Sequence, residues 1–116
     1  MTVTDASVAR PPVIVTLPTE IDATNHDSVH DQLAAACAPG VTTVIADLTG
    51  TTFCDSAGFR VLVLAHRTTD GSGAQLRVAV TPGGSVSRML QVLDLERVLS
   101  VYPSLDAALE SLVGGE

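Results

Sequence analysis

The sequence predicts an α/β domain with a largely parallel β-sheet. Short β-branched runs alternate with segments whose apolar residues recur at helical spacing, as in parallel strands joined by helices. The length of 116 residues suits one compact domain, and 46% hydrophobic residues are enough for one core. With no Trp, one Tyr and two Phe, that core must consist of Val, Leu, Ile and Ala.

The N-terminal third predicts a tail, a strand and a helix. Residues 1–11 are polar and irregular, so we expect a flexible tail there. Residues 13–17 are rich in β-branched side chains and predict a strand, which Pro18 ends because proline cannot donate to a sheet. From Thr24, apolar residues recur at i, i+4, i+7 and i+8, so this segment predicts an amphipathic helix capped by Thr24 or Asn25.

The middle third predicts a buried strand and then a longer helix. Residues 43–48 are almost continuously apolar, which is typical of a strand buried on both faces. After a polar loop, residues 53–54 are expected to return the chain to the core. The helix is expected to start at Asp55 or Ser56 and to run to about Thr69.

The C-terminal third predicts two strands and two helices. The strands are expected at 76–80 and 98–102, and apolar residues between 86 and 93 have helical spacing. The last helix is expected to follow Ser104, whose hydroxyl can cap it. Its expected buried residues are Leu105, Ala108, Leu109 and Leu112.

The charge of the chain excludes some partners and favours others. The net charge is −7, and the six arginines, with no lysine, form no basic stripe, so we expect no direct nucleic-acid binding. An acidic surface favours a basic protein partner instead. The exclusive use of arginine also points to a GC-rich bacterial genome. No apolar run is long enough to span a membrane and no signal peptide is evident, so we expect a cytoplasmic location without membrane contact.

Neither the cysteines nor the histidines make a convincing metal site. Cys37 and Cys54 are most simply small buried hydrophobes, and a regulatory disulfide between them is the less favoured interpretation. His26 and His30 lie one helical turn apart, as in zinc proteases, but that motif needs Glu where Asp27 stands, and no third ligand is evident. We therefore expect no metal and no cofactor.

Ser56 has three interpretations at the start of its helix. It can cap the helix, or it can accept a phosphate that the free amides of the first turn would hold. Arg60, one turn later, is placed to reach that phosphate. The third interpretation, a hydrolase nucleophile, is disfavoured because no Gly-x-Ser-x-Gly elbow surrounds Ser56. His66 is more simply a core or boundary residue, and we expect no enzymatic activity.

Residues 47–59 (DLTGTTFCDSAGF) resemble the central motif of STAS domains, in particular the anti-sigma factor antagonists. Residues 20–25 resemble the family's first-loop motif, and the segments from 86 to 95 and from 104 to 109 follow its C-terminal pattern. The resemblance implies a single STAS domain at residues 12–113. We expect a mixed, mostly parallel sheet of four to five strands, with helices packed mainly on one face.

The resemblance also implies a phosphorylation cycle. In this family the serine matching Ser56 is phosphorylated by an anti-sigma factor that is also a serine kinase. The unphosphorylated antagonist binds that kinase and releases the sigma factor, often in a stress response. A metal-dependent serine phosphatase reverses the modification. The acidic residue matching Asp22 lies beside the phosphoserine in the family fold.

The chain departs from the family pattern near the phosphorylated serine. Ala57 stands where Ser or Thr is usual, Phe59 where Leu is more frequent, and Arg60 where Gly is more frequent. Ser56 is therefore the only acceptor in its motif. We expect the partner to contact these residues: Asp22, Thr24, Asn25, Asp55, Ser56, Ala57, Gly58, Phe59, Arg60 and Arg67.

Gly58 is expected to let the partner approach closely, and we expect a monomer or weak dimer. The alternative function is a structural or adaptor STAS module of a stress-signalling or transport complex, in which Ser56 is never phosphorylated.

Overall fold

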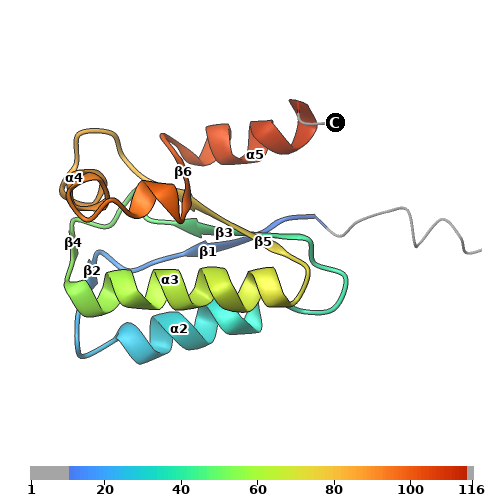
Figure 1. The fold of residues 1–116 in the computed structure, drawn as a ribbon, viewed down its shortest axis with the longest axis horizontal. Coiled ribbons are helices and arrows are strands. Elements are labelled where there is room, and N and C mark those ends of the chain that lie inside the picture. The colour runs from blue at the N-terminus through green and yellow to red at the C-terminus, as the bar shows by residue number, and fades with distance from the viewer. Residues whose placement is uncertain (1–10, 115–116) are drawn as a thin grey trace, which may run out of the picture.

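The computed structural model describes residues 11–114, which form two parallel sheets surrounded by helices (Figure 1). The larger sheet has the strand order β1 (Val13–Thr16), β3 (Thr43–Asp47), β5 (Gln75–Ala79) and β6 (Ser100–Tyr102). The smaller sheet pairs β2 (Glu20–Ile21) with β4 (Phe53–Cys54). Every strand pairing in this part of the chain is parallel, which confirms the predicted α/β fold.

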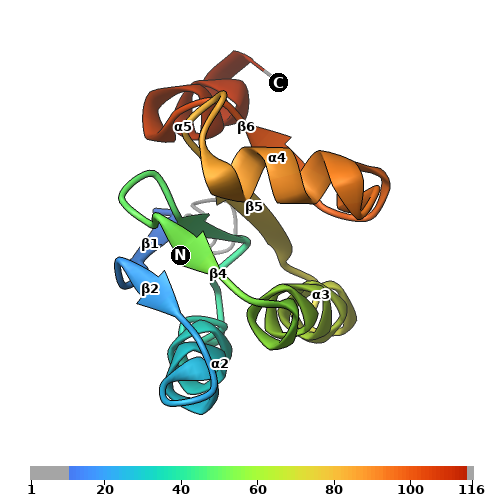
Figure 2. The ribbon, with the colours of Figure 1, turned by 90° about the vertical axis from the view of Figure 1, so that its left-hand side faces the viewer.

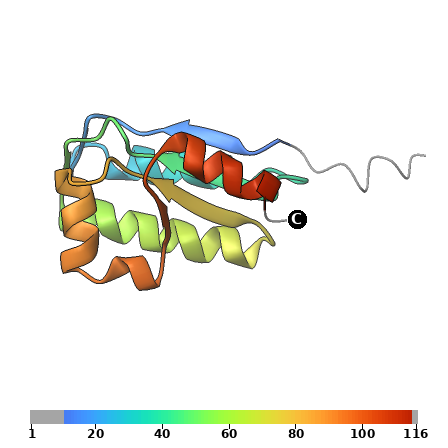
Figure 3. The same ribbon diagram turned by 90° about the horizontal axis from the view of Figure 1, so that it is seen from above.

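The helices divide between the two faces of the larger sheet. They are α2 (His26–Ala35), α3 (Ser56–Gly71), α4 (Ser85–Val92), the short 3₁₀ helix η1 (Leu95–Arg97) and α5 (Leu105–Gly114). The two helices α2 and α3 cover one face side by side, and α5 covers the other (Figures 1 and 3). The remaining helix, α4, lies across the end of the sheet near β2 and β4 (Figure 2).

Strand alternation explains why one face is packed more heavily than the other. In β3, Val44 and Ala46 point toward α2 and α3 and join the large core, while Ile45 points toward α5. The smaller core under α5 contains Ile45, Ala79 and Ala108. Packing mainly on one face is therefore confirmed, with α5 on the lighter face.

A buried arginine contributes to the attachment of α5. Arg77 is 8% exposed, and its guanidinium donates a hydrogen bond of 2.8 Å to the Ala108 carbonyl. The guanidinium also lies 5.2 Å from the centre of the Tyr102 ring, within cation–π distance. This buried charge is paired with helix and strand groups, as burial of a charge requires.

The local sequence signals agree with the observed elements within a few residues. Ser104 caps α5 as predicted, accepting a hydrogen bond of 2.9 Å from the Ala107 amide. Residues 1–10 of the predicted tail lie outside the described residues, as does the side chain of Leu112.

The prediction that residues 53–54 both return to the core is wrong for Phe53. Cys54 is buried, but the Phe53 side chain is 49% exposed. The two residues form β4, and successive side chains of a strand point to opposite sides. The strand β2, which pairs with β4, was not predicted from the sequence.

Candidate functional site

The small β2–β4 sheet brings the loop after β2 to the start of α3. Ile21 aligns with Cys54, and the Asp55 amide donates a hydrogen bond of 3.1 Å to the Ile21 carbonyl. Because parallel strands end at the same edge, the residues that follow them are neighbours. Asp22 therefore lies beside the segment of Asp55 and Ser56.

The cap of α3 is Asp55, which corrects the interpretation of Ser56 as the cap. An oxygen of the Asp55 carboxylate accepts a hydrogen bond of 2.9 Å from the Gly58 amide. Ser56 is the first residue of the helix and is exposed. Within residues 11–114, its hydroxyl forms no hydrogen bond, and the Ser56 and Ala57 amides have no backbone or side-chain acceptor. The helix thus presents a hydroxyl beside two available donors.

Asp22 organises the loop that faces Ser56. Its carboxylate accepts hydrogen bonds from the Thr24 amide (2.9 Å) and the Thr24 hydroxyl (2.6 Å). These bonds, the hydroxyl first, lower the pKa of Asp22 below its ordinary value of 3.8. The Asn25 side chain accepts a hydrogen bond from the Asp22 amide and donates one to the Glu20 carbonyl.

Neither Thr24 nor Asn25 caps α2 with its side chain, contrary to the prediction. The helix begins after Asn25, and no side-chain cap hydrogen bond is present there. Both side chains bond backward into the loop, which keeps Asp22 in place. Their contribution to the site is therefore the shape of the loop.

Two of the residues expected to contact a partner are buried. Phe59 is 2% exposed and belongs to the large core. Gly58 is also buried, and a Cβ atom there would lie 2.6 Å from Cys54 Sγ and 2.8 Å from Ile21 Cγ2. The missing side chain makes room for α3 against β2 and β4, so the expectation that Gly58 admits a partner is wrong.

The arginines of α3 lie on its solvent side. Arg60 and Arg67 are both exposed. Arg60 lines a groove of about 350 Å³ between α2 and α3, together with His26, Asp27, His30, Ala57, Val61 and Leu64. Within residues 11–114, no group of three or more His, Cys, Asp or Glu is arranged to hold a metal ion.

A second groove opens on the other side of Ser56. It measures about 330 Å³ and is lined by Phe53, Cys54, Asp55, Ser56, Ser85 and Met89. Phe53, Ser85 and Met89 were not among the predicted site residues, since Phe53 was expected in the core and Met89 was expected only to follow helical spacing. No local signal distinguished Met89 from Val86, because residues three positions apart lie on the same side of a helix.

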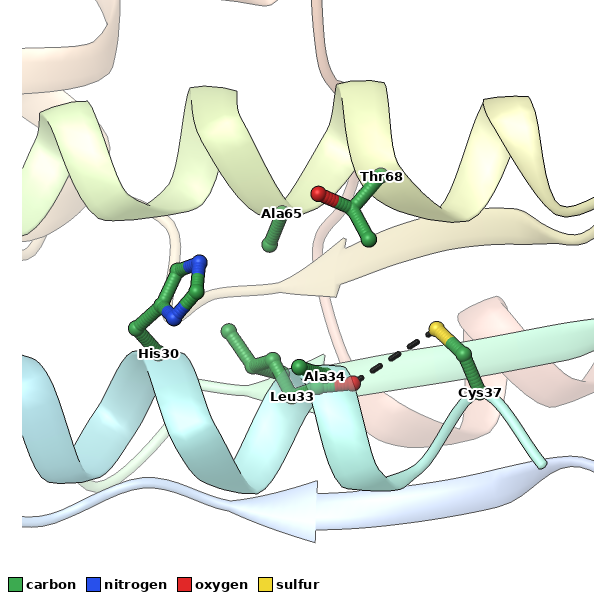
Figure 4. Close-up of a pocket in the computed structure, with 6 residues that line it drawn as sticks. All are labelled: His30, Leu33, Ala34, Cys37, Ala65 and Thr68. Atoms are coloured by element: carbon green, nitrogen blue, oxygen red, sulfur yellow. Dashed lines mark hydrogen bonds between the residues drawn. The ribbon is translucent and has the colours of Figure 1, made fainter.

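The two cysteines are free and separately placed. Cys37 is half-buried beside the gap between α2 and α3, where its thiol donates a hydrogen bond of 3.6 Å to the Leu33 carbonyl (Figure 4). Cys54 is buried, and that burial raises its pKa to about 12. The Cys54 thiol is therefore protonated near neutral pH and is a poor nucleophile.

His66 cannot activate Ser56 as the base of a hydrolase. The two residues lie ten positions apart on α3, which corresponds to about 15 Å along the axis. A general base must lie within hydrogen-bond distance of the proton that it removes.

Comparison with known proteins identifies the fold. An anti-sigma factor antagonist from Mycobacterium paratuberculosis superposes with a TM-score of 0.77 at 20% identity, covering 90% of this chain and 88% of the other. The unphosphorylated anti-sigma factor antagonist SpoIIAA superposes with a TM-score of 0.72 at 20% identity, covering 92% of each chain. The murine anion transporter Slc26a9 superposes with a TM-score of 0.68 at 23% identity. That match covers 91% of this chain and 18% of the transporter.

These likenesses establish the fold and leave the partner open. No curated protein matches the chain significantly. Across residues 11–114, no helix has both the length and the apolar character needed to cross a bilayer. The model of the STAS domain matches residues 3–108, which is most of the sequence. The chain therefore belongs to the STAS domain family.

Proposed function

We propose that this chain is an anti-sigma factor antagonist whose binding is controlled by phosphorylation of Ser56. In the proposed cycle, the unphosphorylated chain binds an anti-sigma factor that is also a serine kinase, and the sigma factor is released. Phosphorylation of Ser56 ends that binding, and a metal-dependent serine phosphatase restores it. The chain acts as a binding protein in the bacterial cytoplasm and needs no enzymatic activity or cofactor of its own.

The observation that carries the proposal is the exposed hydroxyl of Ser56 at the start of α3, which forms no hydrogen bond with the described residues 11–114. Asp55 already caps the helix, so phosphorylation of Ser56 would not break the capping hydrogen bond. The amides of Ser56 and Ala57 and the positive end of the helix dipole stabilise a phosphate at this place. Arg60, exposed one turn later, adds a cation on the same helix.

The surroundings of Ser56 also explain why phosphorylation would weaken binding. The modification adds about −1.5 to −2 charges. These negative charges would lie beside Asp55 and Asp22, on a chain whose net charge is already −7. An interface that fits the unmodified serine would then have to desolvate a dianion. The structural likeness to two anti-sigma factor antagonists supports this assignment.

The test is intact-mass measurement after incubation with ATP and each purified serine-kinase anti-sigma factor of the source genome. We expect wild type to gain one phosphate and Ser56→Ala to gain none. Ser28→Ala is the matched control, because Ser28 is exposed on α2, lines neither groove beside Ser56 and should leave the phosphate gain unchanged.

Absence of phosphate on the wild-type chain with every such kinase would contradict the switch. The charge explanation has a separate test, since Ser56→Glu should bind the anti-sigma factor more weakly than wild type. Equal binding of Ser56→Glu and wild type would reject that explanation alone.

A second candidate function is an adaptor STAS module in a transport or signalling complex. The observation that favours it is the superposition on part of an anion transporter. A gene for a serine-kinase anti-sigma factor beside the gene for this chain would favour the first function. A transporter operon would favour the second.

A further inference from the structure

We propose that a small pocket between α4, η1 and β6 binds a guanidinium group on a short apolar stem. We call it the β6 pocket. It measures about 180 Å³, and its polar lining side chains are Ser87, Glu96 and Tyr102. It shares no lining residue with the two grooves beside Ser56, so we expect it to bind whether or not Ser56 is phosphorylated.

The β6 pocket lies at the carboxyl ends of two parallel strands. Val80 follows directly after β5, Pro103 follows directly after β6, and both line the pocket. Ser87 on α4 and Glu96 on η1 bring side chains of two further elements to it, and η1 contacts both α4 and β6. The carboxyl ends of strands are where α/β sheets generally hold their ligands. The side chains at this place then decide which ligand fits.

Ser87 is a buried polar residue without a partner. It is 9% exposed, and its hydroxyl forms no hydrogen bond within residues 11–114. Burial of an unpaired hydroxyl costs stability, and alanine would avoid that cost and has the higher helix propensity. Folding alone therefore does not favour serine at this position. The residue lines the pocket, where a bound group can complete its hydrogen bonding.

Glu96 gives the pocket a negative charge. It is exposed and forms no ion pair within residues 11–114, whereas its neighbour Arg97 is paired with Asp94 at 3.0 Å. A carboxylate only accepts hydrogen bonds, so the ligand has to bring donors. Arg77, whose guanidinium lies 5.2 Å from the centre of the Tyr102 ring, does not line the pocket and already donates to Gln75 and Ala108.

These properties together select a guanidinium. Its planar group carries several N–H donors, so it can donate to the Ser87 hydroxyl and the Glu96 carboxylate at once. It is more weakly hydrated than an ammonium, which lowers the cost of entering a pocket whose other walls include Val80, Pro82 and Val101. The net charge of −7 attracts cations to the chain.

The size of the pocket limits the ligand to about one side chain. Its volume of about 180 Å³ is below the range of about 300–1,000 Å³ that is usual for drug-sized ligands. The guanidinium can therefore come from an arginine of a partner protein or from a small free alkylguanidine. Both sources present the same group on the same kind of stem.

The test is a ¹H–¹⁵N NMR titration of the full chain with n-propylguanidinium. We expect saturable shifts of the amide signals of residues that line the β6 pocket. Ser87→Ala should weaken binding about tenfold, because it removes a hydrogen bond to a charged group. Glu96→Gln should weaken it about fivefold, because it removes an exposed charge and keeps the length of the side chain. Glu110→Gln is the control, since Glu110 is an exposed acid on α5 that does not line the pocket and should bind as wild type does.

The choice of a cation has its own test. The neutral analogue n-propylurea has nearly the same shape and should bind about tenfold more weakly than n-propylguanidinium, because hydrogen bonds to ionised groups are the stronger ones. Equal binding of the two compounds would overturn the choice of a guanidinium. Tighter binding of N-acetyl-L-arginine amide than of agmatine would support an arginine of a partner protein as the ligand, and the reverse order would support a free guanidine.

Urea unfolding separates binding from stability. Ser87→Ala should be at least as stable as wild type, because the hydroxyl has no hydrogen bond to lose within residues 11–114. Loss of binding at unchanged stability supports the β6 pocket. Shifts that do not saturate in wild type, or that are equally strong in Ser87→Ala and Glu96→Gln, would overturn it. Neither result bears on the phosphorylation of Ser56.

Discussion

Two neighbouring residues at the start of α3 have different roles. Asp55 accepts the hydrogen bond of the Gly58 amide, while the hydroxyl of Ser56 forms none within residues 11–114. A serine at the cap would need its oxygen for the helix, and phosphorylation would disturb that bond. Placing the cap one residue earlier leaves Ser56 free for modification without loss of the helix start.

Asp55→Ala should lower the free energy of unfolding by about 1 kcal/mol, because it removes the cap of α3. Asp55→Asn is the matched control, since asparagine caps about as well and removes only the charge. Urea denaturation at neutral pH measures both. An equal loss in the two variants would show that the charge, and not the cap, provides the stability.

Thr24→Val should raise the pKa of Asp22 toward 3.8, because the Thr24 hydroxyl is the largest cause of its lowering. A carboxyl whose pKa is lowered by folding adds stability above its unfolded pKa, and that stability is lost as the pH falls through the folded pKa. The variant should therefore differ from wild type most above the ordinary pKa of 3.8 and least below the lowered pKa of the folded wild type.

Carboxyl carbon NMR titration measures this pKa directly. Thr24→Ser keeps the hydroxyl and should keep the low pKa of Asp22. An unchanged pKa in Thr24→Val would mean that the backbone amide of residue 24, which the variant retains, is the main cause.

The position of the element α3 depends on close contact with β2 and β4. Gly58 is where the helix crosses them, since a Cβ there would approach Cys54 Sγ and Ile21 Cγ2 to 2.6 and 2.8 Å. The same contact places Asp22 beside Ser56. The absence of a side chain at Gly58 therefore determines how closely α3 packs against β2 and β4, and with it the position of Ser56 relative to Asp22.

Gly58→Ala should destabilise the domain by about 1–3 kcal/mol, because an added methyl group must displace packed neighbours. This loss should exceed the gain in helix propensity, which is at most about 1 kcal/mol. Gly71→Ala is the control on the same helix, since a Cβ there meets nothing within 4 Å. Chemical denaturation compares the two, and a Gly58→Ala variant as stable as wild type would contradict the close contact.

At the scale of the whole molecule, net charge and the contacts around Ser56 should control different steps of binding. The charge of −7 acts at a distance and accelerates encounter with a basic partner. Contacts around Ser56 act only at short range and should determine the dissociation rate. Phosphorylation of Ser56 would therefore alter mainly the dissociation rate.

The association rate with the kinase should fall when the salt concentration rises from about 50 to 200 mM, because salt screens charges more than about 10 Å apart. Ser56→Glu should dissociate faster than wild type, because its added charge lies within the proposed contact. Stopped-flow kinetics separates the two rates. An association rate independent of salt would show that charge does not steer this encounter.

The sequence distance between interacting residues explains which features were predictable from sequence. Ser104 caps α5 as expected, and the strand at residues 43–47 is buried as its apolar run indicated. Both are local signals, because a cap needs only the next few amides and a continuous apolar run has no polar face to leave in water. The motif around Ser56 was likewise readable from consecutive residues.

The features that were missed depend on neighbours distant in sequence. A strand of two residues, such as β2, is too short for any periodicity to indicate. Helical spacing gave Met89 and Leu90 the same expectation, and only the position of α4 at the end of the sheet exposes one and buries the other.

The sequence by itself thus determined the α/β order, the helix starting beside Ser56 and the acidic charge. The tertiary structure decided which residues surround Ser56. In the folded chain, Asp55 caps α3 and Gly58 packs against β2 and β4. Phe53 and Met89 are exposed and line a groove beside Ser56. The physical reason is that capping hydrogen bonds and the apolar periodicity of a helix or strand depend on residues only a few positions apart. Burial depends on which element packs against each face, and that is settled only when the chain has folded.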